Sequence, residues 1–162
     1  MKKILLSILS LITLISCETT PTEGCTDPLA VNYNRHANID NNTCEFTANI
    51  VFYLSQDVAG TLYNSGVNKL TFYINEYNIG SQYSDDDGIF VSGYLTDPPQ
   101  CFDLNFTTGS FYWADSRFTD VDLKAIDESG EEWFSETTQL FANECLIVGI
   151  TPEKLKVHQE NN

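Results

Sequence analysis

Cysteine side chains are the groups in this 162-residue chain whose chemistry is easiest to define. A cysteine can form a disulfide, bind a metal as its thiolate or act as a nucleophile. The five cysteines show no CxxC spacing, which disfavours a four-cysteine zinc site. His36 and His158 are isolated in the sequence, so neither suggests a cysteine–histidine nucleophile. Disulfide formation is therefore the chemistry that this pattern favours.

The first cysteine, Cys17, follows a short apolar stretch. Lys2 and Lys3 form a positively charged start, and residues 4–15 are mostly apolar. This stretch is shorter than the ~20 residues of a membrane-spanning helix, so we interpret residues 1–16 as a signal peptide. It ends in LISC at 14–17, which resembles the lipobox of bacterial lipoproteins. An ordinary secretory signal followed by a chance cysteine is the alternative.

The lipobox resemblance implies that the chain is cleaved before Cys17. It also implies a diacylglycerol on the Cys17 sulfur and an acylated new amino terminus. Two or more acyl chains, at about 0.8 kcal/mol per buried methylene, make a lasting membrane anchor.

Lipidation of Cys17 leaves four cysteines, and an even number in an exported chain favours two disulfides. Three pairings are possible. Cys25 and Cys44 would bracket a compact polar loop, and Cys101 and Cys145 would then join two parts of the larger domain.

The segment 24–45, GCTDPLAVNYNRHANIDNNTCE, resembles a short cysteine-bracketed repeat of exported proteins from Bacteroidota and other marine bacteria. The repeat has the form G-C-x-D-P-x-A-x-N-Y-(N/D)-x-x-A-x-x-D-(D/N)-(G/N)-(S/T)-C. No activity comes with this resemblance. Within the segment, Asp27 followed by Pro28 is a pattern typical of a helix start.

Oxygen-bearing side chains suggest two candidate calcium sites, one in the bracketed loop and one in the acidic run at 85–87. The loop set has one carboxylate and lacks EF-hand spacing, so we favour a structural staple there. For the acidic run we favour a solvated turn, with Asp57 or Asp115 as conceivable partners. The candidate ligands are Asn34, Asn38, Asp40 and Asn42 in the loop and Asp85 and Asp87 in the run.

Aromatic residues of the expected strands could form a platform on which sugars stack. Strand aromatics more often belong to the core or to cross-strand pairs, and we favour that interpretation. The candidate platform residues are Tyr53, Tyr73, Tyr94, Tyr112 and Trp113.

The main domain, residues 46–150, must position these groups. Its apolar residues alternate in short runs between turn residues, and no ten-residue run has a helical period. We therefore predict an all-β fold, an antiparallel β-sandwich of about seven strands. Strands are expected at 48–56, 67–75, 89–91, 101–106, 111–113, 121–126, 133–134 and 146–150. Turns are expected at 75–78, 85–88, 108–110 and 128–131.

The order of these features resembles an uncharacterised Bacteroidota lipoprotein domain, distantly similar to PEGA or carboxypeptidase-regulatory modules. The segments that carry the resemblance are LTFYINEYNIGS at 70–81, Pro-x-Cys at 99–101, TTGSFYWA at 107–114 and ECLIV at 144–148. The predicted organisation is a signal peptide (1–16), a lipidated tether (17–24), the bracketed motif (25–45), the sandwich (46–150) and a tail (151–162).

The charge of the chain excludes some partners. The formal charge is −15, and without the signal six Lys and Arg face 23 Asp and Glu, a charge of −17. Such a chain repels nucleic acid and anionic lipid, so the covalent lipid must supply the membrane attachment. No nucleophile elbow, P-loop, HExxH or dinucleotide-binding fingerprint is present in the sequence.

We therefore expect a non-enzymatic protein without a cofactor, anchored by lipid to the outer membrane on its periplasmic face or at the cell surface. We expect a structural role or the recognition of a protein or glycan partner. The alternative is a calcium-stabilised adhesin or glycan-binding module.

Overall fold

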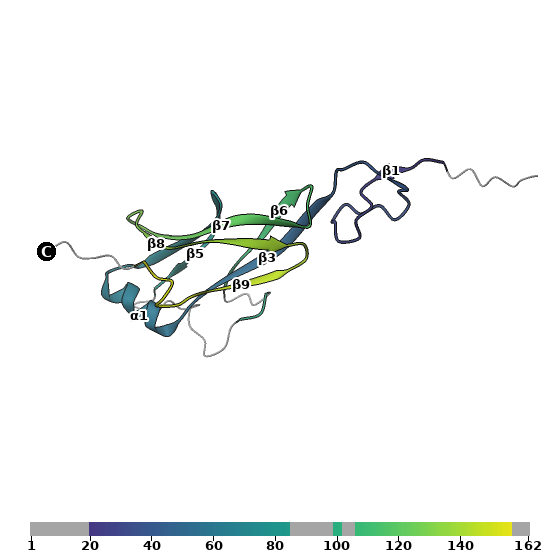
Figure 1. The fold of residues 1–162 in the computed structure, drawn as a ribbon. Coiled ribbons are helices and arrows are strands. Elements are labelled where there is room, and N and C mark those ends of the chain that lie inside the picture. Colours follow the sequence, from purple (N-terminus) through teal and green to yellow (C-terminus); the bar gives the residue numbers. More distant parts are fainter. Residues whose placement is uncertain (1–19, 85–98, 102–105, 157–162) are drawn as a thin grey trace, which may run out of the picture.

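The computed structural model describes residues 20–84, 99–101 and 106–156 (Figure 1). Within these residues the main domain is a sandwich of a three-stranded and a four-stranded sheet, which confirms the predicted all-β sandwich. The three-stranded sheet has the order β6-β3-β9 and contains β3 (Glu45–Leu54), β6 (Thr107–Ala114) and β9 (Cys145–Ile150). The four-stranded sheet has the order β5-β4-β7-β8 and contains β4 (Lys69–Ile74), β5 (Tyr77–Tyr83), β7 (Phe118–Asp127) and β8 (Glu132–Phe141).

One pairing departs from the expected antiparallel pattern. β3 and β9 are parallel, whereas every other pairing within the two sheets of the sandwich is antiparallel. A parallel pair needs a long connection, and here most of the domain lies between the two strands. The chain leaves the four-stranded sheet at Phe141 and enters the three-stranded sheet at Cys145, so a short crossing closes the sandwich.

The core lies between the two sheets and follows from the alternation along the strands. On β3, the even-numbered residues 48–54 are buried in the core that faces the other sheet. Phe52 on β3 and Phe72 on β4 meet across the interface, with ring centroids 4.9 Å apart. Aromatic pairs at this separation add to the stability gained from area burial.

The helix α1 (Gln56–Asn64) was not predicted from the sequence. It has nine residues, and its buried face consists of Val58, Ala59 and Leu62. Gly60 and Thr61 are weak helix formers, so packing against the core stabilises this helix more than propensity does. Ser55 caps its amino end and accepts a hydrogen bond from the Val58 amide.

The predicted turn at 108–110 is wrong, because these residues lie inside β6. Gly109 serves a close approach instead: a Cβ there would lie 3.0 Å from Ile79 of β5. The turn at 128–131 is confirmed, with Gly130 at φ 91°. The turn expected at 75–78 is shorter, since β5 begins at Tyr77. The turn at 85–88, the strand at 89–91 and most of 101–106 lie outside the described residues.

The bracketed motif lies at the end of the sandwich opposite α1 (Figure 1). β1 (Glu23–Gly24), at the end of the predicted tether, and β2 (Ile39–Asp40) of the motif form a two-stranded parallel sheet. The expected helix start at Asp27 is a single turn, in which the Ala30 amide donates to the Asp27 carbonyl. In the described part of the chain, no helix is long and apolar enough to cross a membrane.

Candidate functional site

Two disulfides use the four cysteines of the described chain. Cys25 is bonded to Cys44 and Cys101 to Cys145, with Cα–Cα distances of 4.9 and 5.8 Å. Of the three possible pairings of these four cysteines, the structure therefore has the one that joins the first to the second and the third to the fourth. Cys17 lies outside the described residues.

The Cys101–Cys145 disulfide fastens a segment to the outer face of the three-stranded sheet. Cys101 packs with Phe106 against Val51, an odd-numbered β3 residue that faces away from the sandwich interior. Cys145 opens β9 beside Asn49 of β3. This cover explains why Val51 is fully buried on an outer face.

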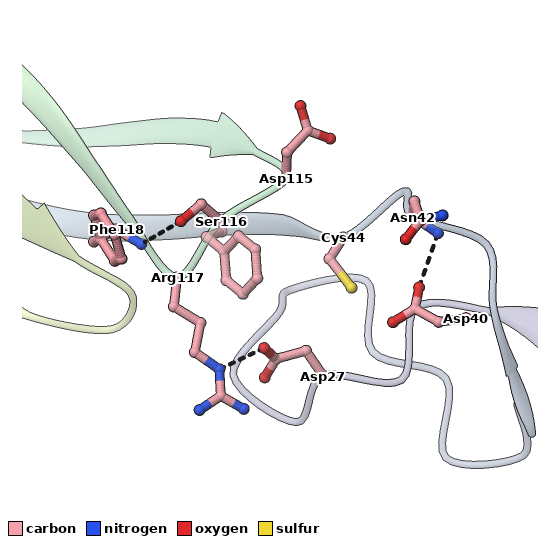
Figure 2. A pocket seen from close by; sticks show the side chains of 9 residues that line it. Asp27, Asp40, Asn42, Cys44, Asp115, Ser116, Arg117 and Phe118 are labelled. Atoms are coloured by element: carbon pink, nitrogen blue, oxygen red, sulfur yellow. Dashed lines mark hydrogen bonds and ion pairs between the residues drawn. The ribbon is translucent and has the colours of Figure 1, made fainter.

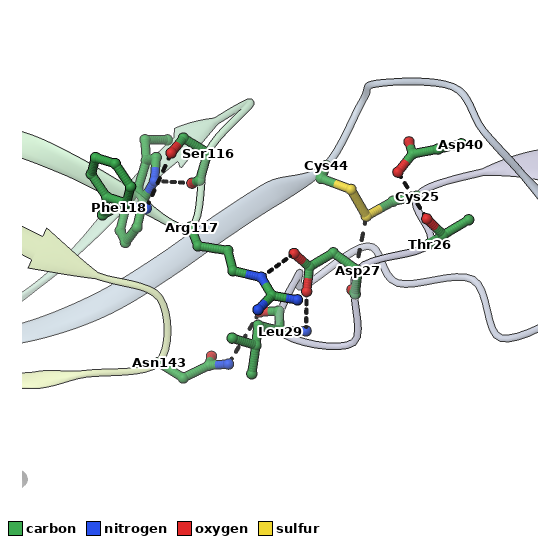
Figure 3. A network of polar contacts seen from close by, with 11 residues as sticks. Cys25, Thr26, Asp27, Leu29, Asp40, Cys44, Ser116, Arg117, Phe118 and Asn143 are labelled. Carbon is green, nitrogen blue, oxygen red and sulfur yellow. Dashed lines mark hydrogen bonds and ion pairs between the residues drawn. A yellow bond between two sulfur atoms is a disulfide. The ribbon is translucent and has the colours of Figure 1, made fainter.

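The Cys25–Cys44 motif is docked on the sandwich by contacts from the turns at its end (Figure 3). The Arg117 Nε donates to the Asp27 Oδ2 at 2.6 Å, which forms an ion pair just before β7. The Asn143 amide group donates to the Leu29 carbonyl at 3.1 Å. The Asp115 amide donates to the Cys44 carbonyl at 3.1 Å. The motif is thus held from both the β6–β7 and the β8–β9 turns.

Aromatic residues also pack at the junction between the motif and the sandwich. Phe46, the first buried residue of β3, stacks on Trp113 of β6 with ring centroids 6.2 Å apart. Phe46 also belongs to the small apolar cluster formed by Cys25, Ala30 and Cys44. The Trp113 indole donates to the Ser116 carbonyl at 2.7 Å, which fixes the turn that carries Arg117.

The backbone at the junction adopts conformations that few side chains tolerate. Among the described residues, four residues other than glycine have left-handed φ values, and three of them are at this junction. They are Asn42 at 56°, Asp115 at 75° and Asn143 at 61°. Asn and Asp tolerate this region better than most residues, so the residue types fit the turns.

The ion pair and nearby amides stabilise charged carboxylates. The hydrogen bond from Arg117 is the main cause that lowers the pKa of Asp27, and the Leu29 amide adds to it against the effect of burial. The Asn42 amide and the Thr26 hydroxyl lower the pKa of Asp40 in the same way. Both carboxylates are therefore ionised at neutral pH.

A cavity of about 660 Å³ lies where the motif meets the β6–β7 turn. Figure 2 shows Arg117 reaching Asp27 across it, while the Asp115 side chain points away from that pair. Apolar surface comes from Phe46 and Phe118, and the rest is mostly acidic or amide. Its lining residues are Asp27, Asp40, Asn42, Cys44, Phe46, Asp115, Ser116, Arg117 and Phe118. This junction cavity is the candidate site, and it offers mainly hydrogen-bond acceptors together with two phenylalanines.

Of the candidate calcium ligands, the structure brings Asp40 and Asn42 to this cavity. The Asp40 oxygens accept from the Asn42 amide and the Thr26 hydroxyl, so they stabilise the loop itself. Asn34 Oδ1 accepts from the His36 amide, and Asn38 Oδ1 accepts from the Thr22 amide. These bonds agree with the structural staple. Calcium binding there stays a prediction.

The second calcium candidate, Asp85 and Asp87, lies outside the described residues. The partners considered for it are far apart, since Asp57 is in α1 and Asp115 is at the opposite end of the sandwich. Within 20–84, 99–101 and 106–156, no group of three or more His, Cys, Asp or Glu side chains could hold a metal ion.

The aromatic residues of the candidate sugar platform belong to two different sheets, and their side chains point to different faces. Tyr53 and Tyr112 lie on the outer face of the three-stranded sheet, whereas Trp113 packs toward the core. Tyr73 lies on the outer face of the four-stranded sheet, because its neighbours Phe72 and Ile74 point inward. Tyr94 lies outside the described residues. The four described aromatics do not form one surface.

The sequence did not indicate the residues that hold the junction together. Arg117 and Asn143 lie 90 and 114 residues after Asp27 and Leu29, the motif residues that they contact, and no local pattern connects them. The only local signal is the turn chemistry of the residues around them.

Comparisons with protein-family models, with curated proteins and with solved structures gave no match to this chain.

Proposed function

We propose that this chain is a non-enzymatic, lipid-anchored envelope protein whose two-part body serves a structural or recognition role. Cysteine usage is the observation that carries the proposal. Four cysteines are consumed by two disulfides, which form in oxidising compartments outside the cytoplasm. The fifth, Cys17, stands at the end of an apolar stretch in a lipobox-like sequence. An exported chain with one unpaired cysteine at that position is the pattern expected of a lipoprotein.

The position of the motif supports the same proposal. The motif begins a few residues after Cys17 and is joined to the sandwich by an ion pair, backbone contacts and aromatic packing. A lipid anchor at the amino terminus would therefore hold the motif and the sandwich at the membrane as one unit.

Recognition at the junction cavity would favour a donor-rich or positively charged group of a partner. Asp40 and Asp115 line the cavity, and the only cationic side chain in its lining, Arg117, is paired with Asp27. Charge complementarity of this kind affects specificity and association rate more than affinity. A protein segment that carries lysine or arginine fits this description.

The experiment that tests the anchor is fractionation of cells that produce the full chain. We expect the wild-type protein in the outer-membrane fraction and its Cys17→Ala variant processed incorrectly and without lipid. Thr19→Ala is the matched control, since it changes a residue two positions away and leaves the lipobox intact. Equal lipid content in the Cys17→Ala variant would remove the proposal.

A further inference from the structure

The exposed apolar side chains of this protein are unevenly distributed. Of the described large hydrophobic residues that are exposed and carry no polar group, five of six lie in the motif or in the strand ends beside it. The sixth is Ile147, whereas the exposed aromatics elsewhere are tyrosines with a hydroxyl group. We call these five residues the tether-end apolar set: Leu29, Val31, Ile39, Phe118 and Phe141.

Two members of the tether-end apolar set form a pair at the end of the four-stranded sheet. Phe118 opens β7 and is opposite Phe141, which ends β8. Their ring centroids are 6.1 Å apart, and their residues are 49% and 47% exposed. Nearby residues of this outer face are polar, such as the hydrogen-bonded Asp122 and Thr137. Two adjacent exposed phenylalanines form an apolar patch, and exposed apolar patches mark surfaces that contact partners or membranes.

A third member, Leu29, contacts the two turns that adjoin this pair. Leu29 is held from both turns: its carbonyl accepts from Asn143, and its amide donates to Asp27, which binds Arg117 (Figure 3). Leu29 is therefore fixed near the two strand ends, although it is about 90 residues away in sequence from Phe118.

We propose that the tether-end apolar set seats the protein on a lipid surface. This inference rests on the proposed anchor at Cys17. Only Glu18 and Thr19 separate Cys17 from Thr20, and Thr22 is already hydrogen-bonded to Asn38 of the motif. An extended chain covers at most about 3.3–3.6 Å per residue, so the five steps from Cys17 to Thr22 span at most about 18 Å. The motif is thus held within roughly 20 Å of the bilayer, at the end where the apolar residues gather. Apolar side chains in this position partition into the membrane interface.

The lipid surface that fits is a neutral one. The mature chain has a formal charge of −17, and Asp27, Asp40 and Asp115 lie at the same end as the apolar set. Anionic lipid would repel these carboxylates. The contact is therefore hydrophobic, and zwitterionic phosphatidylcholine is the appropriate probe.

Two tryptophans provide a built-in measurement. Trp113 is at the tether end, bonded to Ser116, and Trp133 is on β8 near the other end, where Lys156 donates to its carbonyl. The full lipidated chain with Trp133→Phe is reconstituted in phosphatidylcholine vesicles with and without brominated acyl chains, which quench nearby tryptophan. We expect quenching of Trp113, and no quenching of Trp133 in the Trp113→Phe chain.

The variant that removes the apolar contact with lipid is Leu29→Ser combined with Phe118→Ser and Phe141→Ser. We expect its Trp113 quenching to fall about tenfold or more, since each buried apolar group contributes strongly to partition. Tyr112→Ser with Ile147→Ser is the matched control, and it should quench like the wild type. If Trp113 were quenched equally in the triple variant and the wild type, or in neither of them, the proposed lipid contact would be wrong. Stronger binding on adding phosphatidylglycerol would also contradict it.

Failure of the anchor is recognised separately by the intact mass of the protein. If the mass shows no acyl group on Cys17, the secreted chain is added to the same vesicles. Quenching of Trp113 there would keep the lipid-facing surface and discard the anchor, and its absence would discard both.

Discussion

Asp27 and Arg117 form an ion pair with 2.6 Å between Oδ2 and Nε, and they join two parts of the chain that are 90 residues apart in sequence. Asp27 belongs to the disulfide-bracketed motif, and Arg117 belongs to the turn that opens β7. Their contact is therefore the most direct polar connection between the amino-terminal motif and the sandwich.

Removing this pair should loosen the motif without unfolding the sandwich. Arg117 is 58% exposed, so Arg117→Met should lower Tm by only about 1–3 °C. Hydrogen exchange in residues 25–44 should become several-fold faster, whereas β7 and β8 should be unaffected. Lys154→Met is the matched control, because it removes the Lys154–Glu136 pair away from the motif. Equal exchange in the two variants would show that Arg117 does not hold the motif.

The same contact should respond to acid. Because Arg117 lowers the pKa of Asp27 below its ordinary 3.8, the stability from the pair is fully present above that pH. It is lost as the pH falls through the lowered value. Hydrogen exchange of residues 25–44, measured from about pH 5 to pH 2, should accelerate at the acid end in the wild type. Asp27→Asn keeps an acceptor for the Leu29 amide and should remove most of that change; an identical pH profile would argue against the assignment.

The Cys101–Cys145 disulfide should contribute strongly to the stability of the sandwich. The sequence separation is 44 residues, and the chain-entropy estimate for such a loop is about 4 kcal/mol. Cys101→Ser should therefore lower the free energy of unfolding by a few kcal/mol in denaturant titrations. The double variant Cys101→Ser/Cys145→Ser controls for the free thiol. An unchanged midpoint in both variants would mean that the disulfide does not stabilise the native state.

Two glycines should respond oppositely to alanine. Gly109→Ala places a Cβ 3.0 Å from Ile79 and should destabilise the contact between β5 and β6. Gly60→Ala lies in α1 with no atom within 4 Å of the new Cβ, so it should stabilise the protein by about 0.5–1 kcal/mol. Thermal unfolding of the two variants measures both effects, and a stabilising Gly109→Ala would contradict the packing role.

The sequence predicted the parts of this fold that depend on local patterns. Alternation around Leu70, Phe72 and Ile74 identified a strand, and Gly130 marked a turn that the structure contains. The Thr108–Ser110 segment was misinterpreted, because glycine permits both a turn and a close strand contact, and only the tertiary position of Ile79 distinguishes them. Helix α1 was missed for a related reason: its three buried residues are too few to produce a periodic signal.

The junction could not be predicted in the same way. The Asp27–Pro28 pattern predicts a helix start, in which the Asp side chain accepts from an amide of the first turn, and Asp27 does accept from Leu29. Its pairing with Arg117 depends on how the sandwich places the β6–β7 turn against the motif. Nothing in the neighbourhood of either residue in sequence carries that information.

The intact mass of the mature protein, purified from membranes under non-reducing conditions, tests the central proposal most directly. The proposal predicts a chain that begins at Cys17, carries a diacylglycerol and an acyl group, and lacks four thiol hydrogens because of two disulfides. The Cys17 peptide should hold all of the added lipid mass. A chain without lipid, or one that begins elsewhere and has Cys17 as a free thiol, would contradict it.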